Sequence, residues 1–108
     1  MATVELTDAD HEKILSLRVG DVLSVNLSEN PTTGYRWFLD QPLPQFLTPK
    51  SDEFLAPQLS AAGAGGTRNL RFLLGAKGRG DLSTKLYREW EGPQSSIREF
   101  RIQIEAID

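Results

Sequence analysis

Two neighbouring hydroxyl side chains, Thr32 and Thr33, lie in the most distinctive segment of the chain, Asn30-Pro31-Thr32-Thr33-Gly34-Tyr35-Arg36-Trp37. A threonine acts as a nucleophile only beside a general base, and the single histidine, His11, lies in a separate polar stretch near the N-terminus. Because no cluster of ligating residues accompanies His11, we expect neither catalysis nor metal binding there. The two threonines are therefore expected to act by their shape, and we do not expect an enzyme.

The residues that flank the threonines predict a rigid loop. Pro31 fixes its own φ angle, Gly34 permits a positive φ, and the Asn30 side chain can bond to the neighbouring backbone. Threonine is stiff at χ1 and small enough to enter a narrow cleft. The segment is therefore either a simple connecting turn or a loop tip built for insertion into a partner.

Two further segments have the composition of recognition loops. Gly63-Ala64-Gly65-Gly66 lies within a run of small residues, and glycines let one backbone approach another closely enough for hydrogen bonding. Arg88-Glu89-Trp90 combines a planar cation with a large aromatic side chain, and both residue types commonly anchor protein interfaces.

Each of these two segments also has a purely structural interpretation. The glycine-rich run could be a flexible connection without contacts, Trp90 could be a partly buried loop aromatic, and Arg88 with Glu89 could form a solvated charge pair. We do not expect the glycine-rich run to bind phosphate, because no hydrophobic strand precedes it and a strand rather than a helix follows it.

Hydrophobic residues recur at every second position in five segments, which are residues 23–27, 35–39, 70–74, 82–86 and 100–106. Turn residues separate them, and the pattern is typical of an antiparallel, immunoglobulin-like β-sandwich of about seven strands. Trp37 shares a face with Tyr35 and Leu39, so we expect it in the core. Residues 8–17 predict a short helical turn capped by Asp8, although residues 14–17 fit a strand equally well.

The expected strand order places the three distinctive segments together. In an immunoglobulin-like sandwich these segments would be the B–C, D–E and F–G connections. Because successive strands run in opposite directions, every second connection lies at the same end of the sandwich. The sequence therefore predicts one end of the molecule that carries all three loops.

Composition excludes several classes of function. The chain of 108 residues is expected to form one domain, residues 1–108, and its net charge of −3 gives no reason to expect nucleic acid or an anionic membrane as partner. Cysteine is absent, which excludes disulfides and thiolate chemistry. Residues 1–6 show no signal peptide, so we expect an intracellular chain or one that has lost an export signal.

These three segments together resemble the chagasin family of cysteine-protease inhibitors. That family carries an Asn-Pro-Thr-Thr-Gly-aromatic loop, a Gly-X-Gly-Gly loop and an Arg-Pro-Trp-like loop in this order. The first two motifs are complete here, in residues 30–35 and 63–66. The third departs from the family, because Glu89 stands where proline is usual.

The resemblance implies a reversible, non-covalent inhibitor of papain-like cysteine proteases. We expect no cofactor, and a monomer as the default state of the free chain. The resemblance also implies that three loops straddle the active-site cleft: the Thr32-Thr33 tip over the catalytic Cys–His pair, the glycine-rich loop along the non-primed side, and the Trp90 loop over the primed side. The implied protease-binding residues are Asn30, Pro31, Thr32, Thr33, Gly34, Tyr35, Gly63, Ala64, Gly65, Gly66, Arg88, Glu89 and Trp90.

Two other classes of function remain open from the residues alone. The same loops could serve an immunoglobulin-like binding module whose partner is not a protease, or the chain could be a subunit of a larger assembly. The absence of an evident long hydrophobic surface strand argues against the subunit. Inhibition of papain would separate the inhibitor from the other binding module.

Overall fold

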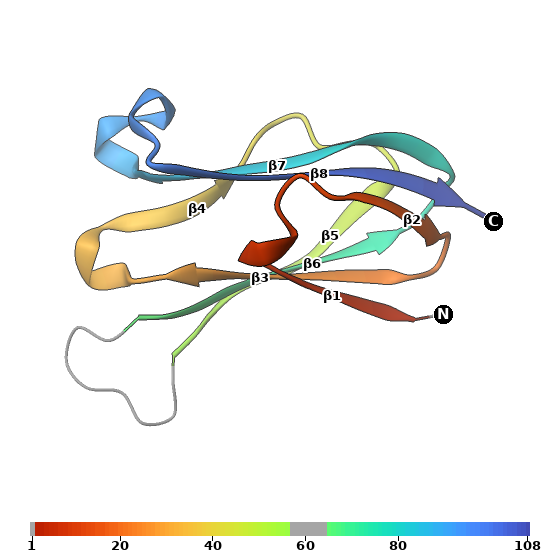
Figure 1. Ribbon diagram of the computed structural model, residues 1–108, viewed down its shortest axis with the longest axis horizontal. Helices are drawn as coiled ribbons and strands as arrows, with labels where there is room; N and C mark the ends of the chain where they lie inside the picture. Colours follow the sequence, from red (N-terminus) through yellow and green to blue (C-terminus); the bar gives the residue numbers. More distant parts are fainter. Residues whose placement is uncertain (1, 57–64) are drawn as a thin grey trace.

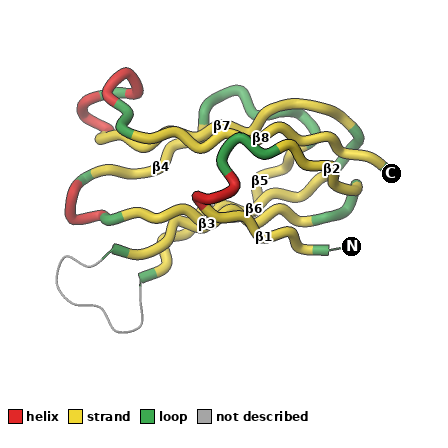
Figure 2. Tube along the Cα trace, viewed as in Figure 1, coloured by secondary structure: helices red, strands yellow, loops and turns green. Residues whose placement is uncertain are grey.

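The computed structural model describes residues 2–56 and 65–108, which form two β-sheets stacked face to face (Figure 1). The first sheet contains, in spatial order, β1 (Thr3–Thr7), β3 (Val22–Glu29), β6 (Gly66–Leu74) and β5 (Leu47–Leu55). The second sheet contains β2 (Ile14–Arg18), β8 (Arg98–Ile107), β7 (Gly78–Arg88) and β4 (Tyr35–Leu39). Short 3-10 helices at Asp8–Asp10, Pro31–Thr33, Glu89–Glu91 and Pro93–Ser95 lie between the strands (Figure 2).

The alternating pattern places one face of each sheet in the core, as expected. Trp37 is 2% exposed, which confirms its assignment to the interior. The two sheets hold together by apolar burial, because the chain has no cysteine to link them. The most deeply buried hydrophobic side chains are Leu23, Val25, Leu27, Leu70, Phe72, Leu74, Leu82, Phe100, Ile102 and Ile104.

The expected all-β sandwich is confirmed, but the described residues form eight strands rather than about seven. Strands β1 and β5 have only a weak alternation of hydrophobic residues. In β5 the register shifts between Pro49 and Ser51, and most of its side chains are exposed, so the hydrophobic period is lost. Both strands lie at edges of the first sheet, where one-sided pairing tolerates polar residues and proline.

The N-terminal region differs from the expectation in the residue that caps the short helix and in the direction in which its strands pair. Thr7, not Asp8, caps the short 3-10 helix, because its hydroxyl accepts from the Ala9 N–H and Asp10 bonds back to the Thr7 N–H at 2.8 Å. Ile14–Arg18 is strand β2, and its pairing with β8 is parallel, as is that of β1 with β3. The four other strand pairs are antiparallel as expected.

The connections expected to carry function lie at the end of the sandwich opposite the two termini (Figure 1). The β3–β4 connection, residues 30–34, and the β7–β8 connection, residues 89–97, meet there. Strand β5 ends and β6 begins at the same end. Gly63 and Ala64 of the predicted second loop lie outside the described residues. In the part of the chain that is described, no helix is long and apolar enough to cross a membrane.

Candidate protease-binding site

The first loop is held in one shape by its own side chains. Asn30 precedes the 3-10 turn, and its Oδ1 accepts from the Thr32 N–H at 3.2 Å and from the Thr32 hydroxyl at 2.7 Å. The Thr33 hydroxyl donates to the Asn30 carbonyl at 2.7 Å and accepts from the Tyr35 N–H at 3.3 Å. The turn ends at Gly34, whose φ of 81° favours glycine. Both threonine hydroxyls are thus engaged within the loop, which supports the predicted rigid shape.

Arg88 joins the first loop to the third. Its Nε donates to the Thr33 carbonyl at 3.0 Å, and its guanidinium lies 4.5 Å from the centre of the Tyr35 ring. The same group lies 6.0 Å from the Trp90 ring. Cation–π contacts of this kind contribute about 0.5–1 kcal/mol where they are exposed to solvent. Arg88 is therefore a bridge between two loops, and its ionic partner is Glu91, at 3.6 Å, rather than the Glu89 of the alternative, purely structural interpretation.

The third loop presents Trp90 to solvent. The indole is 74% exposed, against 2% for Trp37, so the structural interpretation of Trp90 as a partly buried aromatic is wrong. The loop around it is closed by backbone and side-chain hydrogen bonds: Gly92 N–H to the Arg88 carbonyl at 3.2 Å, and the Ser95 hydroxyl to the Gly92 carbonyl at 2.7 Å. These bonds give the loop a defined shape without a proline at position 89.

The described part of the second loop is fitted closely to its neighbours. Gly66 pairs with Glu29 across β6 and β3, and a Cβ added there would lie 2.5 Å from the Leu55 carbonyl oxygen. A Cβ on Gly65 would lie 3.5 Å from the Glu29 carbonyl oxygen. Packing inside the protein therefore requires a glycine at position 66, whether or not this residue also contacts a protease as the family resemblance implies.

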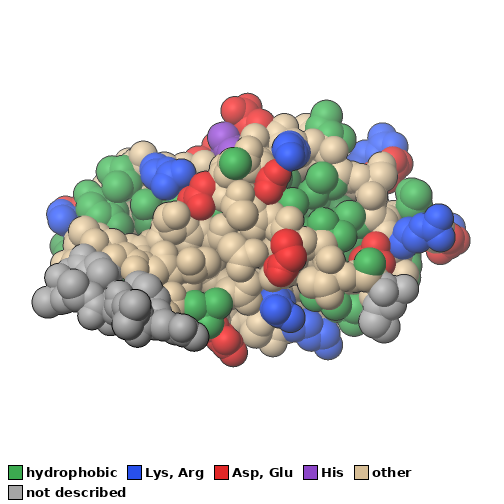
Figure 3. Space-filling view, turned by 60° about the horizontal axis from the view of Figure 1, so that its bottom comes forward, with side chains coloured by type: hydrophobic (Ala, Val, Ile, Leu, Met, Phe, Trp, Pro, Cys, Tyr) green, Lys and Arg blue, Asp and Glu red, His purple; other side chains and the backbone are tan. Residues whose placement is uncertain are grey.

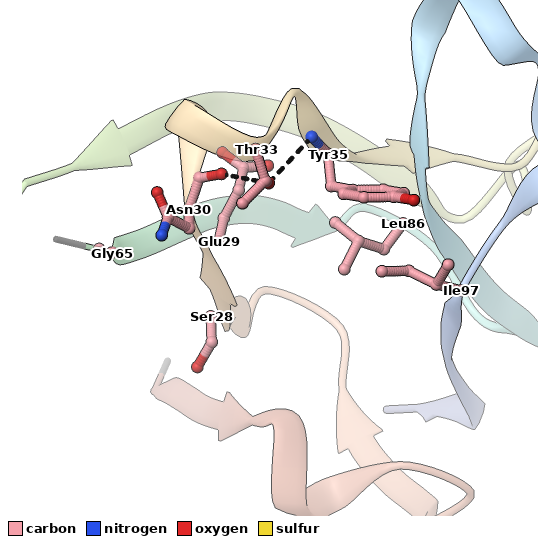
Figure 4. Close-up of a pocket in the computed structure, with 9 residues that line it drawn as sticks. Ser28, Glu29, Asn30, Thr33, Tyr35, Gly65, Leu86 and Ile97 are labelled. Atoms are coloured by element: carbon pink, nitrogen blue, oxygen red, sulfur yellow. Dashed lines mark hydrogen bonds between the residues drawn. The ribbon is translucent and has the colours of Figure 1, made fainter. Parts of the chain in front are cut away.

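An open cavity of about 560 Å³ lies between the loops (Figure 4). Tyr35, Leu86 and Ile97 form its apolar side, while Asn30 and Gly65 lie across from them (Figure 4). The space-filling view shows hydrophobic side chains at the surface of this end, and others toward the opposite end (Figure 3). Ile97 and Trp90 are exposed large hydrophobic residues of this end.

A buried pair of charges, which no prediction from the sequence included, lies where β3 ends and β6 begins. Glu29 and Arg68 are 4% and 8% exposed, and Arg68 Nη2 donates to Glu29 Oε2 at 2.7 Å. Burial lowers the pKa of the Arg68 guanidinium, but hydrogen bonding and charge from Glu29, then from Asp52, outweigh burial and raise it. Arg68 thus stays charged. The sequence contained one signal for this pair. Glu29 and Arg68 occupy the positions that continue the alternation of buried residues in β3 and β6.

The site contains no feature that suggests bond-making chemistry within the described residues. Residues 2–56 and 65–108 hold no group of His, Asp and Glu side chains arranged to bind a metal ion. The Nδ1 atom of His11 accepts from the Arg101 N–H at 3.0 Å, so the histidine fastens the N-terminal segment to β8. The end of the sandwich that carries the loops instead presents a rigid turn, an exposed indole and exposed backbone to a partner.

Comparison with known proteins identifies the family. Residues 16–104 match the model of the family described as Chagasin family peptidase inhibitor I42. The chain is 26% identical to Chagasin from Trypanosoma cruzi in an alignment of length 107, which covers 94% of this chain and 96% of that protein.

Solved structures share the fold. The cysteine protease inhibitor EhICP2 from Entamoeba histolytica superimposes with a TM-score of 0.84 at 20% identity, covering 97% of this chain and 95% of that one. PbICP-C, solved in complex with falcipain-2, superimposes with a TM-score of 0.61 at 20% identity, covering 98% and 99%. Because the family model covers most of the chain, the protein belongs to the chagasin family of peptidase inhibitors.

Proposed function

We infer that this protein is a reversible, non-covalent inhibitor of papain-like cysteine proteases that competes with substrate. The observation that carries the inference is family membership, which extends over residues 16–104. The relatives agree in kind, since EhICP2 is a cysteine protease inhibitor and PbICP-C was solved bound to falcipain-2. The same membership does not favour a binding module with a non-protease partner.

The first loop is proposed to enter the active-site cleft. Its tip at Thr32 and Thr33 is exposed, and the internal hydrogen bonds of both hydroxyls keep the backbone in a turn. A 3-10 turn does not present an extended peptide bond in line with a nucleophile, so the loop blocks the catalytic thiol without being cleaved. Because the loop is rigid before it docks, little conformational entropy is lost on binding.

The second and third loops are proposed to flank the tip, on the non-primed and primed sides respectively. Trp90 supplies a large exposed aromatic surface for a protease pocket, and Arg88 holds it beside the first loop. Gly65 lies where the second loop enters β6, with exposed backbone available for strand-like hydrogen bonds.

Titration against a small panel of proteases tests this function. We expect saturable inhibition of papain-like enzymes, with an apparent inhibition constant that rises with substrate concentration, and no effect on serine or metalloproteases. Recovery of protease activity after dilution, with an intact inhibitor band on a gel, would show that the inhibition is reversible and non-covalent. Full papain-like activity in a large molar excess of folded protein would refute the proposal.

A further inference from the structure

Glu29 lies at the point where the first loop leaves the core. It is the last residue of β3, and Asn30 follows it directly. Its Oε1 accepts from the Trp37 N–H at 2.8 Å. Strands β3 and β4 belong to different sheets, so this bond closes the base of the first loop from one sheet to the other.

The second oxygen of the same carboxylate reaches strand β6, which follows the second loop. Glu29 Oε2 accepts from Arg68 Nε at 3.1 Å and from Nη2 at 2.7 Å. Arg68 follows Gly66 and Thr67 at the start of β6 and also donates from Nη1 to Asp52 on β5 at 3.0 Å. One carboxylate on β3 thus bonds to β4, which follows the first loop, and to β6, which follows the second loop.

Stability alone is a poor reason for this arrangement. Removing two charges from water costs several kcal/mol, and well-packed apolar residues commonly replace a buried ion pair without loss of stability. What a paired and directed carboxylate supplies is a defined geometry, since each of its bonds fixes one strand relative to another. The side chains of the pair are 1% and 10% exposed, so the geometry is shielded from competing water.

We propose that Glu29 is a positioning residue of the inhibitor, which acts through Trp37 and Arg68 to hold the first loop in the placement relative to strands β4 and β6 that the protease requires. The proposal rests on the proposed function, because its effect is on inhibition. Glu29 itself is 4% exposed, so its proposed effect on inhibition is indirect. Its loss would widen the range of loop placements in the free protein and thereby raise the entropy cost of docking.

The test compares Glu29→Gln with a matched variant at the opposite end of the molecule. Glutamine can still accept from the Trp37 N–H but no longer supplies a negative charge to Arg68. Glu105→Gln removes the carboxylate of the exposed Arg79–Glu105 pair, whose atoms are 2.6 Å apart. We expect Glu29→Gln to raise the inhibition constant about tenfold, mainly through faster dissociation, while Glu105→Gln leaves it within about twofold.

Amide hydrogen exchange separates positioning from general stability. Measured where all variants are fully folded, exchange at Thr32–Tyr35 should be faster in Glu29→Gln than in the natural protein, while exchange at residues 102–106 of β8 stays unchanged. An unchanged inhibition constant with unchanged exchange at Thr32–Tyr35 would overturn the proposal. So would weaker inhibition accompanied by uniformly faster exchange, because that would show loss of the whole fold.

Arg68→Lys provides a second variant if Glu29→Gln does not fold. Lysine keeps the positive charge beside Glu29, but it cannot bond to Glu29 in the two-nitrogen geometry while also reaching Asp52. We expect weaker inhibition in the folded protein, and inhibition equal to that of the natural protein would contradict the proposal. If the natural protein does not inhibit, the proposed function itself fails, and the exchange comparison still tests whether Glu29 orders the loop.

Discussion

The indole of Trp90 lies in the space that a side chain at Gly34 would occupy. A Cβ built on Gly34 would lie 2.5 Å from Trp90 Cη2 and 3.3 Å from Cζ2. The glycine is therefore required twice, once for its φ of 81° and once for contact between the first and third loops. This contact, together with the Arg88 bridge, makes the two loops one surface.

Gly34→Ala should weaken inhibition because it displaces Trp90 as well as straining the backbone. Gly20→Ala is the matched control, since Gly20 has a φ of 96° but nothing within 4 Å of its Cβ position. Both variants should lose about 1–2 kcal/mol of unfolding free energy from a residue forced to positive φ. Only Gly34→Ala should raise the inhibition constant, measured by titration against papain. Equal inhibition by the two variants would show that the Trp90 contact is irrelevant.

Thr33 should contribute its hydroxyl to the shape of the loop rather than to the protease. Thr33→Val keeps the branched shape but loses the bonds to the Asn30 carbonyl and the Tyr35 N–H. We expect it to weaken inhibition by about fivefold, which corresponds to about 1 kcal/mol for one net hydrogen bond. Thr33→Ser keeps the hydroxyl and should stay within about twofold. Stronger loss in the serine variant would mean that the methyl group carries the effect.

The sequence predicted most of the scaffold because burial follows local periodicity. Strands β3, β4, β6, β7 and β8 have a clear alternation of two, and the core position of Trp37 and the shared end of the first and third loops follow from it. The edge strand β5 was missed because its side chains are mostly exposed, so no buried face imposes a pattern. The parallel pairing of β1 and β2 leaves no signal in either strand alone.

The contacts inside the site were less predictable, since they depend on strand register and side-chain direction. Arg88 meets the first loop because β4 and β7 pair Tyr35 with Arg88, and no local pattern specifies that register. A charge pair of Arg88 with its neighbour Glu89 was one possible interpretation of the sequence, but the 3-10 turn brings Glu91 to Arg88 instead. The role of Glu29 was hidden for a similar reason, because its partner Arg68 is distant in the chain.

The two tryptophans should separate binding from folding. Trp37 is buried, its Nε1 donates to the Ser28 carbonyl at 2.8 Å, and Trp37→Ala should cost about 3–5 kcal/mol of unfolding free energy. Trp90→Ala should leave stability nearly unchanged and cost about 2 kcal/mol or more of binding, about thirtyfold in the inhibition constant. Chemical denaturation and protease titration measure the two quantities. Equal midpoints of unfolding for the two variants would refute this division.

Stability should fall in acid partly through Asp21. The Arg18 N–H and then the Ala2 N–H, each at 3.0 Å, lower the pKa of this carboxyl below its ordinary value. A carboxyl with a lowered folded pKa stabilises the fold above its unfolded pKa of about 3.9, and this stabilisation is lost as pH falls through the folded pKa. Asp21→Asn should therefore have a lower unfolding free energy than the natural protein at pH 7, and its unfolding free energy should depend less on pH in the acid range. Denaturation midpoints measured from pH 7 to 2 test this prediction, with Asp81→Asn, at an exposed position, as the control. If the midpoints of both variants change equally with pH, Asp21 does not contribute to the loss of stability in acid.

The charge of Glu89 should decide which proteases bind well. Glu91 is neutralised by Arg88, and within the described residues no cation lies at ion-pair distance from Glu89, so Glu89 carries the acidic character beside Trp90. Because the loop is already closed by the Gly92–Arg88 hydrogen bond, stiffening at position 89 should matter less than charge. A rim charge acts mainly on the association rate and fades as salt rises.

Comparing Glu89→Gln with Glu89→Pro separates charge from stiffness, because only the proline variant also restricts φ. Against a protease with a basic primed side, both variants should associate more slowly than the natural protein at low salt, and the difference should shrink at high salt. Against an acidic primed side, both should associate faster. If only Glu89→Pro changes the inhibition constant, equally for both proteases and without salt dependence, then stiffness rather than charge governs this position, because the glutamine variant retains the flexible backbone.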